Sequence, residues 1–165
     1  MFKIGDRIVY GANGVMEIVD VREESIGDVS RNYYVLSSVC SRSDSLIFVP
    51  CDSERLLSVM RHLLTREEAL ELIGRIDKLP DIEWVESNRA RADHFKKLME
   101  SADREAMFSM IRAIDENAKR REAEGKKNFL TDETARQKAE RLLHSELALD
   151  LDIPIEEVAS FIKNH

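Results

Sequence analysis

The sequence predicts an α+β protein in which a small antiparallel β module precedes an all-helical bundle of about five helices. Up to about Thr65, short runs rich in β-branched residues alternate with Gly, Asn and Pro, a pattern typical of strands joined by tight turns. From Thr65 onward, apolar residues recur every three or four positions, which is typical of amphipathic helices. A chain of 165 residues is long enough for two small domains. We place them at residues 1–64 and 65–165.

Five short strands are expected in the first module. Residues 2–10 and 15–22 predict a hairpin, because the glycines and Asn13 of the intervening turn tolerate positive φ. Further strands are predicted at 32–39, 45–49 and 56–61. Pro50 ends the fourth strand because it cannot donate to a ladder. Five short antiparallel strands in about 60 residues suggest a small curled sheet or partly open barrel of the SH3 or Tudor kind.

The helical module begins with Thr65-Arg66-Glu67-Glu68, a capping-box pattern that predicts a helix to about Asp77. Apolar periodicity predicts four more helices, at 82–100, at about 103–123, from Thr131 and after Asp152. The helix over 82–100 is expected to be capped by Asp81 and to turn four residues toward the bundle core: Val85, Ala92, Phe95 and Met99.

Composition narrows the classes of function. A net charge of −7 argues against a protein that coats nucleic acid, because non-specific affinity comes mainly from phosphate neutralisation. Residues 84–130 are nevertheless net positive, with eleven basic and nine acidic side chains. Cys40 and Cys51 lack Cys-x-x-Cys spacing, and no signal peptide or long apolar run is visible. We expect a cytoplasmic monomer without a membrane partner, whose two thiols are reduced and act as small buried hydrophobes.

Catalytic chemistry is not indicated. None of the four histidines is spaced as a metal-binding pair or lies near a cysteine, and no glycine-rich phosphate loop occurs. The paired glutamates at 67–68 and 156–157 fall at predicted helix N-termini, where carboxylates favourably meet the macrodipole. We therefore expect no enzymatic activity, no cofactor and no metal site.

Several segments resemble a known family: Ile4-Gly5-Asp6, Val9-Tyr10, Gly14, Tyr33-Tyr34-Val35-Leu36, Leu46-Ile47-Phe48-Val49-Pro50 and Val59-Met60-Arg61. The chain resembles the CarD/CdnL family of bacterial transcription regulators, whose N-terminal module is shared with transcription-repair coupling factor. The resemblance continues through Trp84 and a late helix over 139–148. No helicase motifs follow the β module, which excludes a coupling factor itself.

The resemblance implies that the β module docks on the β subunit of RNA polymerase. Arg22 matches a position where the family often offers a basic contact, whereas Phe48 stands where a number of relatives place a basic residue. The segment with Ile47, Phe48 and Val49 has two interpretations: an edge strand that pairs with a polymerase strand, or an ordinary core strand. Arg22 likewise has the alternative of a solvated charge at a strand end.

The resemblance also implies that the helical module touches promoter DNA at the upstream edge of the melted bubble. Trp84, in the predicted first helical turn and followed by Asn88, would act as a wedge. Stacking on a base contributes about 1–3 kcal/mol. Its position eleven residues before Phe95 equally allows a core role. A Trp84 exposed beside Arg89 and Arg91 would support DNA contact, whereas burial against Phe95 would support a protein-interaction adaptor.

Four cations are candidates for phosphate contacts that position the protein without reading sequence: Arg89, Arg91, Lys126 and Lys127. Arg89 matches a basic family position, and the lysine pair has the alternative of a solubilising role. Glu86 and Ser87 occupy places that are commonly basic in the family, so weak DNA affinity is expected.

The sequence thus favours a transcription regulator that binds RNA polymerase and modulates open-complex stability. The alternative is a protein-protein interaction adaptor whose acidic helical bundle never meets DNA.

Overall fold

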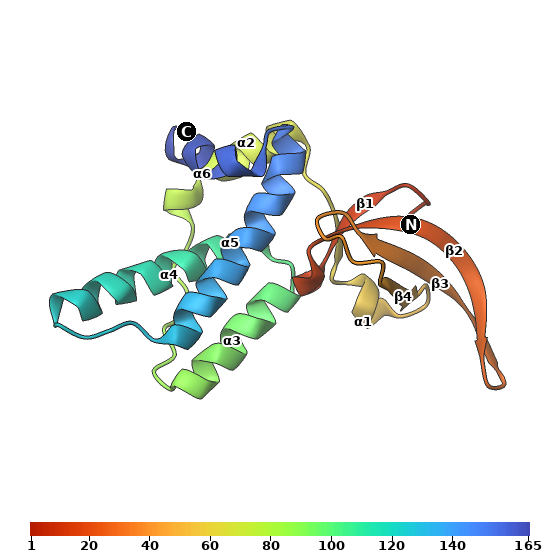
Figure 1. Ribbon diagram of the computed structural model, residues 1–165, viewed down its shortest axis with the longest axis horizontal. Helices are drawn as coiled ribbons and strands as arrows, with labels where there is room; N and C mark the ends of the chain where they lie inside the picture. The colour runs from red at the N-terminus through yellow and green to blue at the C-terminus, as the bar shows by residue number, and fades with distance from the viewer. The chain divides into compact units, whose positions relative to one another are not determined.

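The computed structural model describes residues 1–165, which form two compact units, Met1–Leu63 and Leu64–His165 (Figure 1). The division lies where the sequence pattern changes near Thr65. None of the helices combines the length and the apolar content that a membrane crossing requires.

The first unit is a five-stranded antiparallel sheet with strand order β4-β3-β2-β1-β5. The strands are β1 (Arg7–Tyr10), β2 (Val15–Ile26), β3 (Val29–Ser38), β4 (Leu46–Pro50) and β5 (Met60–His62). β1 begins later than predicted, because Gly5 has a φ of +93° and the Asp6 carboxylate accepts from the Lys3 N–H at 2.8 Å. The expected α+β class, with its antiparallel module first, is confirmed.

The predicted last strand over 56–61 is largely wrong. Residues Glu54–Leu57 form the short helix α1, because the Ser53 side chain caps it by accepting from the Leu56 N–H. Only Met60–His62 remain as a strand, paired with β1.

β2 and β3 continue well beyond the rest of the sheet. β4 ends at Pro50, opposite Tyr33, so that residues 23–26 and 29–32 pair only with each other around a turn at Gly27. Ile26 and Val29 at its end are 72% and 56% exposed. This two-stranded ribbon is the curved extension of β2 and β3 in Figure 1.

One face of the sheet carries the core of the β unit. Its buried residues are Ile8, Met16, Ile18, Tyr34, Leu36, Val49 and Met60. Leu56 and Leu57 of α1 pack against this cluster, which explains why the short helix is retained. Of the two cysteines, Cys51 also packs here and is free, but Cys40 is exposed, so the expectation that both are buried is wrong.

The second unit contains α2 (Arg66–Gly74), α3 (Asn88–Glu100), α4 (Arg104–Ala123), α5 (Leu130–Leu151) and α6 (Ile155–Lys163). The long helix α5 contacts each of the other four (Figure 1). The predicted capping box at Thr65 and Glu68 is present, with both reciprocal hydrogen bonds. Buried apolar residues of the bundle include Phe95, Met99, Met107, Met110, Ile114, Ala139, Leu143, Leu147 and Val158.

The helix expected over 82–100 begins later than predicted. α3 starts at Asn88 after Ser87, whose hydroxyl accepts from the Ala90 N–H, while residues 81–85 have no regular secondary structure. Asp81 therefore does not cap this helix, and Trp84 precedes it. Ala92 is exposed, because the buried stripe is Arg91, Phe95 and Met99.

Two buried carboxylates lie one turn apart on α5. Glu146 is paired with Arg104, whose Nε lies 2.7 Å from Oε1. Both oxygens of Asp150 are buried without a hydrogen-bond partner. Desolvation, and then the negative charge of Glu146, raise the pKa of Asp150 to about 8.

Asp150 should make the protein less stable as the pH rises. In the unfolded chain this carboxyl group ionises near pH 4, whereas the folded protein keeps its proton to about pH 8, so the stability that it contributes is lost between these values. Asp150→Asn removes the titration and should flatten the decline in urea midpoint between pH 5 and pH 8.

The matched control is Asp152→Asn, at the exposed left-handed position after α5. It should retain the pH dependence of the unchanged protein. Equal slopes for Asp150→Asn and the unchanged protein would contradict the assignment.

Candidate functional site

The β unit presents a small aromatic and cationic surface beside its β4 edge. The guanidinium carbon of Arg22 lies 5.1 Å from the centroid of the Phe48 ring, and Tyr33 meets that ring edge-on at 6.2 Å. Strand register explains the grouping: Arg22 is opposite Tyr33, which is opposite Pro50 of β4. Opposite residues project from the same face, so these side chains meet across three strands. We call Arg22, Tyr33 and Phe48 the β4 edge surface.

Charge and exposure define this surface further. The Arg22 side chain is 44% exposed and Phe48 is 40% exposed. Arg22 Nε also pairs with Glu24 Oε1 at 2.8 Å. Arg22 Nη1 lies 3.6 Å from Oδ2 of Asp20, so the Phe48 ring and two carboxylates together hold the guanidinium in one orientation.

β4 satisfies both interpretations that the sequence left open. It pairs only with β3 and is an edge strand, yet Val49 is fully buried and Ile47 packs against the core. The Val49 side chain is enclosed in the core and Ile47 is half-buried, while strand pairing of Ile47, Phe48 and Val49 with the polymerase stays a prediction.

The direction of the β4 backbone follows from its ladder. The Cys51 N–H donates to the Asn32 carbonyl at 2.9 Å. Because an antiparallel ladder alternates, the N–H and C=O of Phe48 point away from β3. Phe48 therefore presents an exposed side chain together with a backbone N–H and C=O that point away from the sheet. Tyr33 was not among the residues predicted for this surface. Its period-two spacing from Val35, which is opposite Phe48, is the signal that could have identified it.

The helical unit gathers a second group of residues before α3. Arg91 makes a two-pronged ion pair with Asp132 of α5, with Nε–Oδ1 and Nη2–Oδ2 distances of 2.8 and 2.9 Å. Its Nη1 donates to the carbonyls of Val85 and Glu86 at 2.9 and 3.2 Å. Arg91 is 1% exposed.

Aromatic rings surround this guanidinium. Its carbon lies 4.6 Å from the Trp84 ring centroid and 5.1 Å from that of Phe129. Trp84 also meets Phe95 edge-on at 6.1 Å, and Arg121 lies 4.0 Å from the Phe129 centroid. The Trp84 cluster consists of five residues: Trp84, Arg91, Phe95, Arg121 and Phe129.

The prediction that Arg91 contacts a DNA phosphate is wrong, whereas Trp84 and Asn88 are each partly engaged in contacts within the unit. Arg91 is enclosed by its ion pair and cannot reach a phosphate from this position. Trp84 falls between its two interpretations, because it packs on Phe95 and Arg91 but is only partly buried. Asn88 is exposed, but its Oδ1 accepts from Arg91 Nη2 at 2.7 Å.

Three predicted cations remain exposed. Lys126 is paired with Glu124 at 3.0 Å, and its hydrogen bond and charge lower the pKa of that carboxyl group. Arg89 and Lys127 are exposed and make no side-chain ion pair. Arg121 Nε donates to the Lys127 carbonyl at 2.9 Å, and both Arg121 and Arg91 lie against the Phe129 ring. These contacts connect residues 81–85, which we call the Trp84 segment, to Lys126 and Lys127.

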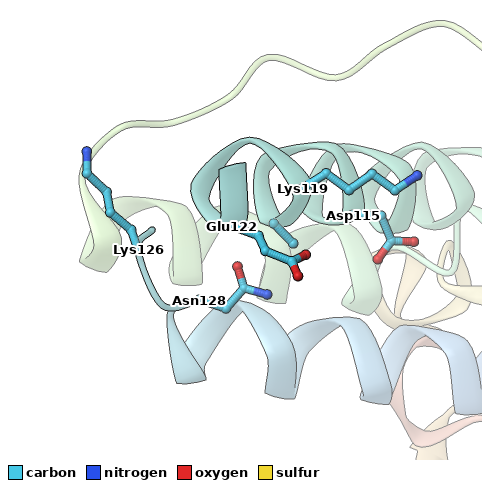
Figure 2. A pocket seen from close by; sticks show the side chains of 6 residues that line it. Asp115, Lys119, Glu122, Lys126 and Asn128 are labelled. Atoms are coloured by element: carbon cyan, nitrogen blue, oxygen red, sulfur yellow. The ribbon is translucent and has the colours of Figure 1, made fainter. Parts of the chain in front are cut away.

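A hollow of about 400 Å³ lies between the end of α4 and the segment before α5 (Figure 2). It is lined by Asp115, Ala118, Lys119, Glu122, Lys126 and Asn128. In Figure 2 the Glu122 carboxylate is turned toward Asn128, while the Lys126 ammonium points away from the hollow. The space itself is thus not suited to a phosphate. No group of three or more His, Cys, Asp or Glu side chains is arranged to hold a metal ion.

The β unit is similar to a known protein family. Residues 2–63 match the family model described as CarD-like/TRCF RID domain. The match covers the sheet, including β5, and ends before α2. No curated protein matches the chain.

Trp84→Ala should lower stability by an intermediate amount. A fully buried Trp or Phe typically costs ~3–5 kcal/mol on truncation, so the partly buried Trp84 should cost ~2 kcal/mol and lower Tm by roughly 5 °C. Phe95→Ala, at a position 1% exposed, provides the buried reference for thermal and urea unfolding. Equal losses for the two variants would place Trp84 in the core, and no loss would contradict its packing on Phe95.

Proposed function

We propose that this chain is a transcription regulator that binds RNA polymerase and modulates the stability of the promoter open complex, because residues 2–63 match the model of the CarD-like/TRCF RID domain. Domains of this kind interact with the β subunit of the polymerase, which agrees with the resemblance noted in the sequence. The proposal assigns polymerase binding to the β unit and promoter contact to the helical unit. It assigns no catalytic step to either.

The β4 edge surface supports the polymerase contact. Arg22 offers a planar fork of donors, Phe48 offers an exposed ring, and Arg and aromatic residues contribute most strongly at the centres of interfaces. The outward backbone of Phe48 adds a place at which an extended segment could pair. Side-chain and backbone recognition therefore coincide at one strand edge.

The Trp84 end of the helical unit supports a weak DNA contact. A partly exposed indole can stack on an unpaired base, and Arg89, Lys126 and Lys127 offer exposed positive charge. With Arg91 buried and a net charge of −7, affinity for free duplex should be low. Polymerase binding compensates by raising the local concentration.

The mechanism is differential binding to promoter states. A contact that is stronger with melted than with closed DNA shifts the equilibrium toward opening. A preference of about 1.4 kcal/mol changes that ratio about tenfold. One stacked base provides this amount, since stacking contributes about 1–3 kcal/mol.

Two observations favour the adaptor as a second candidate: Arg91 is buried, and Trp84 packs on Phe95. In that case the acidic bundle would bind another protein, and this chain would make no contact of its own with DNA. Photo-crosslinking between position 89 and promoter DNA in the polymerase complex discriminates between the two. Crosslinks to upstream bubble DNA support the regulator, and crosslinks to protein alone support the adaptor.

Arg22→Glu should weaken binding to the polymerase β subunit by at least about tenfold, because it removes the donor fork and reverses its charge. The exposed side chain contributes little to the core, so thermal unfolding should not change. Arg7→Glu is a matched control on β1, with an exposed side chain and a loose 4.0 Å ion pair with Glu17. Calorimetric affinities that fall equally for both variants would remove Arg22 from the interface.

Trp84→Ala should shorten the open-complex lifetime about five- to tenfold, as expected for the loss of one stacked base, while polymerase binding is retained. Trp84→Phe keeps an aromatic face and should retain part of the effect. Lifetimes are measured by competitor challenge with saturating protein. An unchanged lifetime for folded, polymerase-bound Trp84→Ala would reject the DNA contact and favour the adaptor.

A further inference from the structure

The segment that carries Trp84 has no helical or sheet hydrogen bonds to fix it. Residues 81–85 lack regular secondary structure, and α3 begins only at Asn88. A tryptophan ring on such a segment would ordinarily sample several positions, at an entropic cost to any contact that needs one of them. Something other than local backbone structure must hold it.

Ser109 and Arg112 of α4 hold the start of this segment, through the carbonyls of Pro80 and Leu79 and the carboxylate of Asp81. The side chain of Arg91 holds its other end, next to Trp84. A guanidinium has five N–H donors, and the geometry gives Arg91 five acceptors. They are the two carboxylate oxygens of Asp132, the carbonyls of Val85 and Glu86, and Oδ1 of Asn88. Three of the five belong to residues 85–88, next to Trp84, and two belong to α5.

The rings complete the enclosure and extend it. Trp84 and Phe129 lie against the guanidinium at 4.6 and 5.1 Å. Arg121 contacts the Phe129 ring and binds the Lys127 carbonyl. One buried side chain thus joins the Trp84 segment to the segment that presents Lys126 and Lys127.

We propose that Arg91 is a positioning residue, which fixes the Trp84 ring and the Lys126–Lys127 segment on one surface without touching DNA itself. The DNA part of this inference rests on the proposed function, but the fixing of Trp84 can be measured in the free protein. A buried ion pair can often be replaced by apolar residues without loss of folding stability. The positioning role of Arg91 and Asp132 is therefore separate from any contribution to stability.

Lysine should not replace Arg91 in this role. A lysine ammonium could still pair with Asp132, but it has three donors at one point and no planar face to lie against two rings. Arg91→Lys therefore retains the ion pair and loses the fork that reaches Val85 and Glu86. This separates the charge of position 91 from its geometry.

The test uses two variants and one control. Arg91→Lys keeps the charge, and the double variant Arg91→Met with Asp132→Leu removes both charges so that neither is left buried and unpaired. Lys96→Met is the control, because Lys96 is exposed on the same helix, makes only a loose 4.0 Å ion pair with Glu100 and is not among the proposed DNA contacts. Circular dichroism and urea unfolding establish which variants are folded.

Trp84 is the only tryptophan, so its fluorescence reports on this segment alone. Both Arg91 variants should shift its emission to longer wavelength and raise acrylamide quenching by about twofold, because a residue whose supporting contacts are removed becomes loosely held. Lys96→Met should leave both signals unchanged. Unchanged emission and quenching in a folded Arg91 variant would overturn the inference, whatever happens with DNA.

Open-complex lifetime provides the second measurement. Arg91→Lys should shorten the lifetime, and adding Trp84→Ala to it should shorten it no further, because both changes remove the same contact. Fully additive shortening would overturn the proposal that Arg91 acts through Trp84. If the fluorescence changes as expected and Trp84→Ala alone has no effect on lifetime, the positioning of the ring is supported and the proposed DNA function fails.

Discussion

The Arg91–Asp132 pair is the interaction on which the organisation of the helical unit's Trp84 end depends. Because Arg91 occupies the carbonyls of Val85 and Glu86, the chain before Ser87 is held outside α3, and the helix begins at Asn88. The same guanidinium binds α5 near its start through Asp132. A charge enclosed at 1% exposure is tolerated because each of its donors is satisfied.

Much of the architecture could be predicted from local sequence. Capping chemistry and periodicity predict the Thr65 capping box and the start and end of α4, and the structure agrees with them. The start of α3 could not be predicted in this way, because Asp81 and Ser87 are both good capping residues. Asp81 instead pairs with Arg112 of α4, 31 residues away in the sequence, at 2.9 Å, and Arg91 occupies the carbonyls of Val85 and Glu86 before Ser87.

The site residues show the same limit. Arg91 falls on the buried stripe with Phe95 and Met99, a helical spacing visible in the sequence, but a charged residue there has no local signal for its partner. For β4, period-two alternation already separates Phe48 from Ile47 and Val49. Its place at the sheet edge could not be predicted, because strand order is set by pairing between distant segments. The polymerase and DNA contacts of individual residues stay predictions.

The ribbon formed by the far parts of β2 and β3 has a consequence for local dynamics. Beyond Tyr33 it has two strands, with Ile26 and Val29 largely exposed at its end. Two strands alone are marginally stable in water, so this ribbon should open and close without unfolding of the core around Ile18 and Leu36. Its backbone amides should exchange with solvent deuterium faster than those of the central strands. A partner seated on the adjoining β4 edge surface would slow that exchange, so the exchange rate of the ribbon would report whether that surface is occupied.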